Sequence, residues 1–556
     1  MIDRRLTGYL ASKVGAKAPQ CFLYAMNDWH LHDHFTDGHE EGGLIRYIKL
    51  FTLVAGIVLL IACINFMNLA TARSQQRARE VGVRKVMGAG RSGLISRFIG
   101  ESLIMSFLAV LLAVGLCYAA LPAYNALLGR TLTPGILQPM HLVWLLSIGL
   151  ITGLLAGSYP ALYLSSFQPI KVLKGANGNT GVGVARIRKG LVVTQFAVSI
   201  VFIISTVIIY QQLQYLQGRD LGYNKEGLIY MNIQGDIQKH FAAVRGQLLS
   251  SGMVENVSMS LHDPLHVYGS TDQFNWQGKD PHKRLSINVN NVSAQYVSTM
   301  GMKLVQGRDF YNNADVDSAN VIINESMARL MGNAGRAGAL ITSGSYQLHV
   351  AGVIRDFVFN DMYGPSAPLI LFCDPSAGNV LEIRLRRGVG MARALDGTKN
   401  VLKAANPGYP FDYQFVDQVF AQQFATETLI GSLSRIFAVL AIFISCLGLF
   451  GLAAYTAERR TREIGIRKVL GASVRGMAVL LSKDFLQLVS ISCLIAFPVS
   501  WWAMVKWLGD YPYRTTIGWW VFVMAGLAAL AIALITVSFH AIRTALANPV
   551  KSLRSE

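Results

Sequence analysis

The chain has 556 residues, of which 52% are hydrophobic and only 15% are charged. This composition, with a mean hydropathy of +0.38, excludes an ordinary soluble globular protein and is typical of an integral membrane protein. The formal net charge of +18 does not point to a nucleic-acid partner, because the excess Lys and Arg lie in loops between apolar runs, where membrane topology accounts for them.

The first 47 residues are polar and mixed in character. Within them, His30, His32 and His34 recur with a period of two, so on a strand all three would share one face. No cysteine or spaced carboxylate set completes a metal shell around them. The sequence therefore favours a half-buried strand near a membrane surface over a metal site, and it indicates no cofactor.

Seven apolar runs follow, each close to the ~20 residues that cross a bilayer as a helix. They span residues 48–72, 101–122, 143–164, 190–211, 432–456, 485–507 and 519–543. The loops after the first, third and fifth runs are rich in Lys and Arg, whereas the short loops at 123–142 and 508–518 each contain a single Arg. The positive-inside rule makes the basic loops cytoplasmic and places residues 1–47 and 212–431 outside. We therefore predict a polytopic α-helical membrane protein with about seven transmembrane helices.

One short stretch occurs twice. REVGVRKVMGA, from Arg79 to Ala89, returns as REIGIRKVLGA, from Arg462 to Ala472, at an offset of 383 residues (463 − 80). SFQPIKVL and ALANPVKSL echo each other at nearly the same offset, 380 residues (549 − 169). Two matched landmarks indicate an internal duplication.

The repeated stretch predicts a short basic amphipathic helix along the cytoplasmic membrane face. On a helix its apolar residues would fall roughly on one side and its charges on the other. In the first copy the apolar residues are Val81, Val83, Val86 and Met87. Glu80 and Arg84 stand four residues apart and can pair, and Gly88 is suited to end the helix. The alternative is a loop that anchors the topology by positive charge alone, but charge does not require Glu, two Gly and Ala at matched positions in both copies.

Polar residues near the apolar runs have structural interpretations. Glu101 opens the second run and Asp484 stands at the matching place in the second copy, so both suit a helix N-terminus through the macrodipole. Gln195 is the main polar group inside an apolar run, and hydrogen bonding between helices suffices to explain it.

Residues 174–189 join the two halves of the chain and are expected to form a Gly-rich cytoplasmic linker. No GxxxxGK[ST] motif occurs there or elsewhere, so the chain shows no sign of an NTPase of its own. We expect a non-catalytic membrane subunit.

Residues 212–431 predict a mixed α/β extracytoplasmic domain. Its β-like runs are bounded by Gly, Asp and Pro, and they are LIYMNI, LSINVNNVS, ANVIINE, QLHVAGVI, LILFC and LEIRL. Asn324 is placed to cap a helix after the third of them. Val416, Phe420, Phe424 and Leu429 recur at helical spacing, so a helix here and an extension of the fourth run are expected to form a stalk. The His, Ser and Asp residues are scattered, without the context of a catalytic triad.

These residues together resemble the FtsX-like/MacB-like permease family of ABC transporters. The resemblance rests on the paired motif, on RIRKGLVVTQFAVSI at Arg186 to Ile200, and on the external pattern VSTMGMKLVQGRDF, NVIINESMARLMG and VAGVIRDF. It covers essentially the whole chain. The family's unit is one helix, a large extracytoplasmic domain and three more helices, and some members carry two such units in tandem.

The resemblance implies a domain organisation within the bacterial inner membrane. Residues 1–47 would be the remnant of a first periplasmic domain, since the first unit lacks its opening helix and most of that domain. Residues 48–173 would form the first permease unit. Residues 190–211 would be the helix that enters the periplasmic domain at 212–431, and 432–556 would form the second permease unit.

The resemblance also implies a partner and a mechanism. Separate ATPase subunits would dock on the cytoplasmic motif helices, and their ATP-driven dimerisation would move the external domain. The contact residues implied are Arg79, Glu80, Gly82, Arg84, Lys85, Gly88 and Ala89, with Arg462, Glu463, Gly465, Arg467, Lys468, Gly471 and Ala472. Export or extraction of a substrate at the outer face is expected, with membrane lipid and a periplasmic adaptor or other external protein as further partners, and no nucleic acid. The alternatives are an ATP-driven signalling protein that switches an external partner such as a cell-wall hydrolase, and a membrane-anchored binding domain without an ATPase.

Overall fold

The computed structural model describes most of the chain. The described residues are 2–14, 21–32, 34–36, 39–72, 74–128, 131–133, 135–136, 138–165, 180–280, 282–311, 316–459, 466, 470 and 473–546. The chain divides into two compact units. Residues 1–209, 429–504 and 517–556 form the helical unit, and residues 210–428 and 505–516 form the sheet unit.

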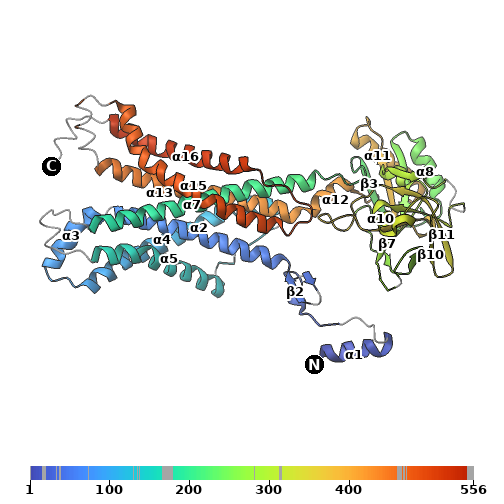
Figure 1. The fold of residues 1–556 in the computed structure, drawn as a ribbon, viewed down its shortest axis with the longest axis horizontal. Helices are drawn as coiled ribbons and strands as arrows, with labels where there is room; N and C mark the ends of the chain where they lie inside the picture. Colours follow the sequence, from blue (N-terminus) through green and yellow to red (C-terminus); the bar gives the residue numbers. More distant parts are fainter. Residues whose placement is uncertain are drawn as a thin grey trace. The chain divides into compact units, whose positions relative to one another are not determined.

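Long apolar helices make up the helical unit (Figure 1). They are α2 (Leu44–Ala72), α4 (Arg91–Leu128), α5 (Pro139–Ser165), α7 (Thr180–Gln217), α13 (Ala425–Arg459), α15 (Val474–Leu508) and α16 (Trp519–Leu546). The shorter elements are α1 (Ile2–Val14), the 3-10 helix η1 (Met26–Asp28), the strands β1 (His34–Thr36) and β2 (His39–Gly42), and α3 (Ser74–Val86). In the described part of the chain, seven helices are long and apolar enough to cross a membrane. The predicted polytopic α-helical fold is therefore confirmed.

Several helices begin before the apolar runs that predicted them. α4 begins at Arg91 and α15 at Val474, so Glu101 and Asp484 lie well inside their helices and their predicted place at helix N-termini is wrong. Glu101 instead accepts a 3.3 Å hydrogen bond from Nε of Arg97, one turn earlier. α7 begins at Thr180, within the stretch expected to be linker. An apolar run marks only the part of a helix suited to the bilayer, and polar residues with adequate helix propensity extend it.

The predicted three-histidine strand is also wrong. Strand β1 begins only at His34, and His30 lies in a turn. The side chain of His32, which lies before β1, contacts the Glu40 carboxylate on β2. Among the described residues, no group of three or more His, Cys, Asp or Glu side chains could hold a metal ion.

Glycines allow α4 and α5 to pack closely. An added Cβ at any of three α5 glycines would come within 2.7–2.8 Å of an α4 side chain; the pairs are Gly149 with Phe107, Gly153 with Leu103, and Gly157 with Ser102. In a membrane such close van der Waals packing replaces burial from water as the force between helices.

The sheet unit contains a mixed β-sheet. Its strands are β3 (Leu228–Asn232), β4 (Val254–Ser260), β5 (Ser270–Thr271), β6 (Phe274–Trp276), β7 (Ile287–Val292), β8 (Leu304–Gly307), β9 (Asn320–Asn324), β10 (Leu340–Ser343), β11 (Tyr346–Ile354), β12 (Leu369–Cys373), β13 (Val380–Leu385) and β14 (Gln414–Phe415). In the described residues they are ordered β14-β3-β13-β4-β7-β12-β9-β11-β10-β6, with β5 beside β7 and β8 beside β11. The pairs β7–β12 and β9–β11 are parallel.

The helices of the sheet unit are short. They are α8 (Phe241–Ser250), α9 (Tyr296–Met300), α10 (Glu325–Met331), α11 (Met391–Ala405) and α12 (Val416–Gln423), with the 3-10 turns η2 (Gly332–Ala334) and η3 (Pro375–Ala377). Asn324 caps α10 as predicted, since its Oδ1 accepts a 3.0 Å hydrogen bond from the Met327 amide. All six predicted β-like runs are strands, so the mixed α/β fold is confirmed.

One of the two expected stalk helices is divided. α7 continues without a break to Gln217, but α12 ends at Gln423 and α13 begins at Ala425. Phe424 lies between them and is buried in the same apolar cluster as Val416 and Phe420 of α12. This part of the predicted stalk therefore packs into the core of the sheet unit.

A carboxyl group is buried in the centre of the sheet. Glu382 on β13 is fully buried, and its Oε2 accepts a 2.8 Å hydrogen bond from Ser258 Oγ on β4. Ser260 Oγ contacts Glu382 Oε1 and also donates to the carbonyl of His262 at 2.6 Å. A hydroxyl has one proton and a carbonyl can only accept, so Ser260 can satisfy both contacts only if the carboxyl group donates to it. Burial correspondingly raises the pKa of Glu382 to about 8.

Candidate functional site

The first copy of the repeated motif forms α3 and the turn after it. α3 ends at Val86, and Gly88 follows with φ of +93°. This left-handed conformation ends many helices, and glycine adopts it without strain. The Gly88 amide donates to the Lys85 carbonyl at 3.1 Å and the Ala89 amide to the Arg84 carbonyl at 2.9 Å. The helix therefore ends where the glycine was expected to end it.

The charged residues of α3 are bound to each other and to neighbouring helices. Arg84 and Glu80 form an ion pair at 2.7 Å, and Arg97 of α4 lies 3.8 Å from the same carboxylate. Lys85 Nζ donates at 2.6 Å to the carbonyl of Ser165, the last residue of α5. Carbonyls at a helix end lack helical donors, so Lys85 supplies one and fixes α3 to α5. The partly exposed ion pair adds little stability, but it sets the direction of Arg84.

The apolar residues of α3 do not share one side. Val81 and Gly82 are buried, while Val83, Val86 and Met87 are 46%, 67% and 76% exposed. Val81 and Val83 are two residues apart and so point to nearly opposite sides of a helix. The predicted single apolar side is therefore wrong for Val81. Val83, Val86 and Met87 form an exposed apolar surface, called the motif patch below.

Most of the second copy lies outside the described residues. This holds for Arg462, Glu463, Gly465, Arg467, Lys468, Gly471 and Ala472, and for the side chain of Arg79 in the first copy. Ile466 and Leu470 are described, and they are 50% and 80% exposed. They follow Val83 and Met87 by 383 residues (466 − 83 and 470 − 87). Equivalent positions thus expose apolar side chains in both copies.

The exposure of Val83, Val86 and Met87 differs from the prediction, because an amphipathic helix along the membrane face would turn its apolar side toward the lipid. The sequence does contain a signal for these positions. The two copies differ at 83 and 466 and at 87 and 470, yet all four residues are apolar. Water-facing positions would not need to keep an apolar side chain.

α2 and α13, the helices that lead to the two copies, meet at equivalent positions. An added Cβ at Gly448 of α13 would lie 2.7 Å from Asn65 Oδ1 of α2, and one at Gly451 would lie 2.2 Å from Leu69 Cδ2. Asn65 and Gly448 are 383 residues apart (448 − 65), the same offset as the motif. Contact between equivalent positions is the property of a two-fold axis. We call this contact of Asn65, Leu69, Gly448 and Gly451 the repeat crossing.

Polar groups are buried at the repeat crossing. Asn68 is fully buried and, within the described residues, neither of its amide atoms has a hydrogen-bond partner; Asn65 Oδ1 also lacks one. Gln195 of α7 donates to the carbonyl of Ile444 on α13 at 3.3 Å, which is the interhelical hydrogen bond expected for it. A buried polar group without a partner costs ~1–3 kcal/mol, so this contact is not the most stable that these helices could make.

In the part of the chain that the structure describes, seven helices able to cross a membrane and a separate sheet unit define a polytopic membrane protein with an extracytoplasmic domain. The model of the FtsX-like permease C-terminal domain matches residues 52–169 and again residues 435–549. The chain therefore carries the FtsX-like permease C-terminal domain twice, once in each half. Each match contains one copy of the motif, which confirms the internal duplication.

Curated relatives agree with this assignment. An ABC transporter permease of Bacillus subtilis, YknZ, is 28% identical over 22% of this chain and 30% of its own length. The macrolide export ATP-binding/permease protein MacB of Salmonella paratyphi A is 25% identical over 38% of this chain and 34% of its own length. The chain thus matches about a third of each relative's length.

A solved structure resembles part of the chain more distantly. The periplasmic region of MacB from Actinobacillus actinomycetemcomitans is 14% identical and aligns over 36% of this chain and 94% of that structure, with a TM-score of 0.27.

Proposed function

We propose that this chain is the permease subunit that couples ATP hydrolysis by separate ATPase subunits to movement of the sheet unit. The observation that carries the proposal is the pair of equivalent apolar surfaces on the duplicated cytoplasmic motif: the motif patch in the first copy, and Ile466 and Leu470 in the second. Exposed apolar clusters on a folded protein commonly mark a contact with another protein or with the membrane.

The surroundings of the motif patch favour a protein partner over lipid. Glu80 and Arg84 lie on the same short helix and are partly exposed. An apolar centre with charged residues around it is the usual composition of a protein–protein interface. Lys85 is bound to the end of α5, so in this proposal it positions α3 and does not contact the ATPase.

The proposed movement begins at the motif helices. α2 leads into α3, and α13 leads into the second motif copy, so a partner that moves either motif acts directly on the repeat crossing. A rearrangement there would give new hydrogen-bond partners to Asn65 Oδ1 and to both amide atoms of Asn68, which have none among the described residues. α13 and α7 both continue into the sheet unit along the chain. We propose that this movement serves export or extraction at the outer face, with a periplasmic adaptor or another external protein as partner.

The test is capture of the ATPase encoded beside this gene by the tagged full chain. Met87→Glu with Leu470→Glu is expected to lower capture at least about tenfold, because a central apolar anchor is worth ~2 kcal/mol or more at a protein interface. Arg84→Glu with Arg467→Glu tests the charged residues in the same way. Tyr346→Glu, a similarly exposed aromatic of the sheet unit, is the control and is expected to leave capture unchanged. Undiminished capture by both double variants, with normal membrane insertion, would refute the proposed contact.

Gly88 gives a second, smaller effect. Gly88→Ala is expected to loosen the end of α3 and lower capture by about fivefold, since a left-handed backbone costs a residue with a Cβ roughly 1–2 kcal/mol. Gly90→Ala is a matched control: an added Cβ has open space at both positions, but only Gly88 has a positive φ. Equal capture by the two variants would show that the end of α3 does not shape the contact.

A further inference from the structure

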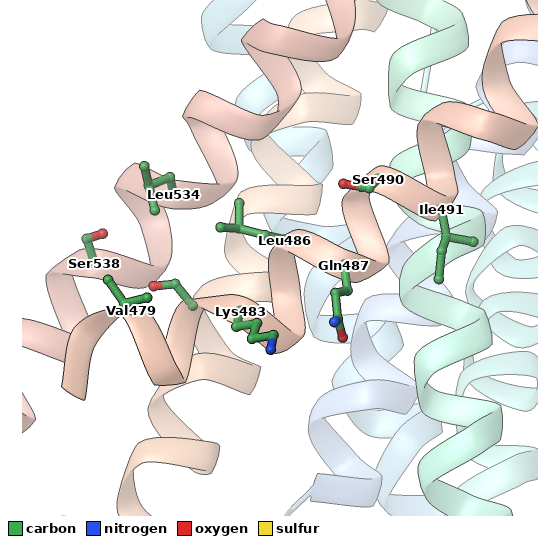
Figure 2. A pocket seen from close by; sticks show the side chains of 9 residues that line it. Val479, Lys483, Leu486, Gln487, Ser490, Ile491, Leu534 and Ser538 are labelled. Carbon is green, nitrogen blue, oxygen red and sulfur yellow. The ribbon is translucent and has the colours of Figure 1, made fainter. Parts of the chain in front are cut away.

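A groove opens between α15 and α16 near their cytoplasmic ends (Figure 2). Its volume is about 740 Å³, and its lining includes Lys483, Gln487 and Ser490 of α15 and Leu534 and Ser538 of α16. Further along, the two helices are in contact: the Phe497 and Phe522 rings lie 5.7 Å apart. The groove is thus the part of this helix pair that no described side chain fills.

Four polar side chains that line the groove have no hydrogen-bond partner among the described residues. Within the described residues, Lys483, Gln487, Ser490 and Ser538 make no side-chain hydrogen bond or ion pair. Other serines of α15 behave differently: Ser492 and Ser500 each donate to the carbonyl four residues earlier, at 2.8 and 2.6 Å. An amide or hydroxyl group in a bilayer without a partner costs several kcal/mol. No described residue supplies such a partner, so a group from outside the described part of the chain can provide one.

The first repeat has no equivalent groove chemistry. At the offset of 383 residues, Lys483, Gln487 and Ser490 correspond to Gly100, Ile104 and Phe107 of α4. Phe107 lies against Gly149, where α4 and α5 pack closely. Ile104 and Gln487 are both exposed. Ile104 is apolar, as expected of a residue that faces lipid, whereas Gln487 is polar. The polar stripe on α15 is thus a property of the second repeat and not of the duplicated fold.

We propose that this groove is a binding site for one anionic phospholipid of the cytoplasmic leaflet. Lys483 lies directly before the apolar run of residues 485–507, and so close to the level of the lipid phosphates. Gln487 and Ser490 follow about 6 and 10 Å deeper, from the 1.5 Å rise per residue of a helix. Figure 2 shows Lys483 and Gln487 projecting from α15 one turn apart, with Leu534 and Ser538 on the neighbouring helix.

This order of side chains matches the order of groups in a phospholipid. A cation meets the phosphate, the amide and hydroxyl groups lie at the depth of the glycerol esters, and Leu486, Ile491 and Leu534 line the groove for the acyl chains. No acidic side chain is among the described lining residues, so the site favours a net negative headgroup over a zwitterionic one. A helix of another protein could also supply a hydrogen-bond partner for Gln487. The experiment below distinguishes such a helix from a lipid. The proposal does not depend on the ATPase contact.

The test measures lipid retained by the full chain in a mild non-ionic detergent, by native mass spectrometry during titration with phosphatidylglycerol. Phosphatidylcholine and inorganic phosphate are titrated in parallel. Lys483→Gln is expected to weaken phosphatidylglycerol binding about fivefold, because one Lys near an anionic headgroup contributes ~1 kcal/mol. Gln487→Leu, with nearly the same volume, is expected to weaken it by a similar factor. Lys49→Gln is the control, since Lys49 is an exposed Lys at the other end of a membrane-spanning helix, α2.

Three results would overturn the proposal. Equal binding of phosphatidylcholine and phosphatidylglycerol, or equal loss in Lys483→Gln and Lys49→Gln, would show only unspecific attraction. Retention of inorganic phosphate as tight as that of the lipid would show an anion site without acyl-chain recognition. Loss of an oligomer or partner in Gln487→Leu, with unchanged lipid binding, would show that the groove holds a helix.

Discussion

Glu382→Gln is expected to abolish a pH dependence of stability. In the wild type, the free energy of unfolding of the sheet unit is expected to fall by about 2.5 kcal/mol between pH 5.5 and pH 7.5. The pKa of Glu382 is raised to about 8 in the folded protein, while an unfolded Glu titrates near 4.3. Between these values the folded state keeps a proton that the unfolded state has released. The free energy of unfolding therefore falls by ~1.4 kcal/mol for each unit of rising pH and levels off above about pH 8.

Gln is the suitable replacement because it keeps the hydrogen bonds of a protonated carboxyl group. Its amide nitrogen can donate to Ser260, and its carbonyl oxygen can accept from Ser258. The measurement is a urea titration of the full chain, followed by maleimide labelling of Cys373, a buried thiol of the sheet unit. The other cysteines are replaced, and wild type and variant are compared at each pH so that the pH dependence of labelling cancels.

Glu255→Gln supplies the control, since Glu255 is exposed on the neighbouring strand β4. It makes the same change of charge and is expected to leave the pH dependence as it is in the wild type. A wild-type urea midpoint that does not change between pH 5.5 and 7.5 would show that Glu382 is not held protonated. A Glu382→Gln variant less stable than wild type at every pH would show that the buried group is needed as a carboxylate.

The sequence predicted elements whose signal is local and missed those whose signal depends on the rest of the fold. Seven helices were recognisable because each apolar run is long enough to span a bilayer. The strand at Val254–Ser260 was missed because VENVSMS is polar along much of its length, although β4 lies beside β13 in the middle of the sheet. Ser258 and Ser260 are buried because their hydroxyl groups contact the buried carboxyl group of Glu382 on the neighbouring strand. A local sequence pattern cannot reveal such a contact between strands.

The candidate site was predictable in position and only partly in detail. Duplication alone marked both motif copies, because chance does not repeat eight identical residues at one spacing. Which face of α3 is exposed depends on Val81 packing inward, and that is decided by contacts with other helices. The offset of 383 residues places Asn65 opposite Gly448 in the sequence, but their contact requires that α2 and α13 cross at that level. Sequence periodicity does not fix such a crossing.

Gly448→Leu is expected to separate α2 and α13 and to stop ATP-driven movement, while leaving capture of the ATPase intact. A Cβ at this position would lie 2.7 Å from Asn65 Oδ1 and 3.0 Å from Gln195 Nε2, and a larger side chain would push both helices apart. Overpacking of this kind costs ~1–3 kcal/mol. The motif patch, and Ile466 and Leu470 in the second copy, follow α2 and α13 in the chain. These exposed residues would therefore stay available to the ATPase.

The separation can be measured by cross-linking Phe51→Cys with Phe437→Cys, because the two rings lie 6.0 Å apart on α2 and α13. Gly448→Leu is expected to reduce this cross-link at least about threefold. Gly115→Leu is the control, since an added Cβ on α4 at that position meets no atom within 4 Å. Asn65→Ala removes the side chain that the added group would strike, so the double variant Asn65→Ala with Gly448→Leu should recover the cross-link. An unchanged cross-link in Gly448→Leu, or no recovery in the double variant, would show that the repeats do not meet at this pair of residues.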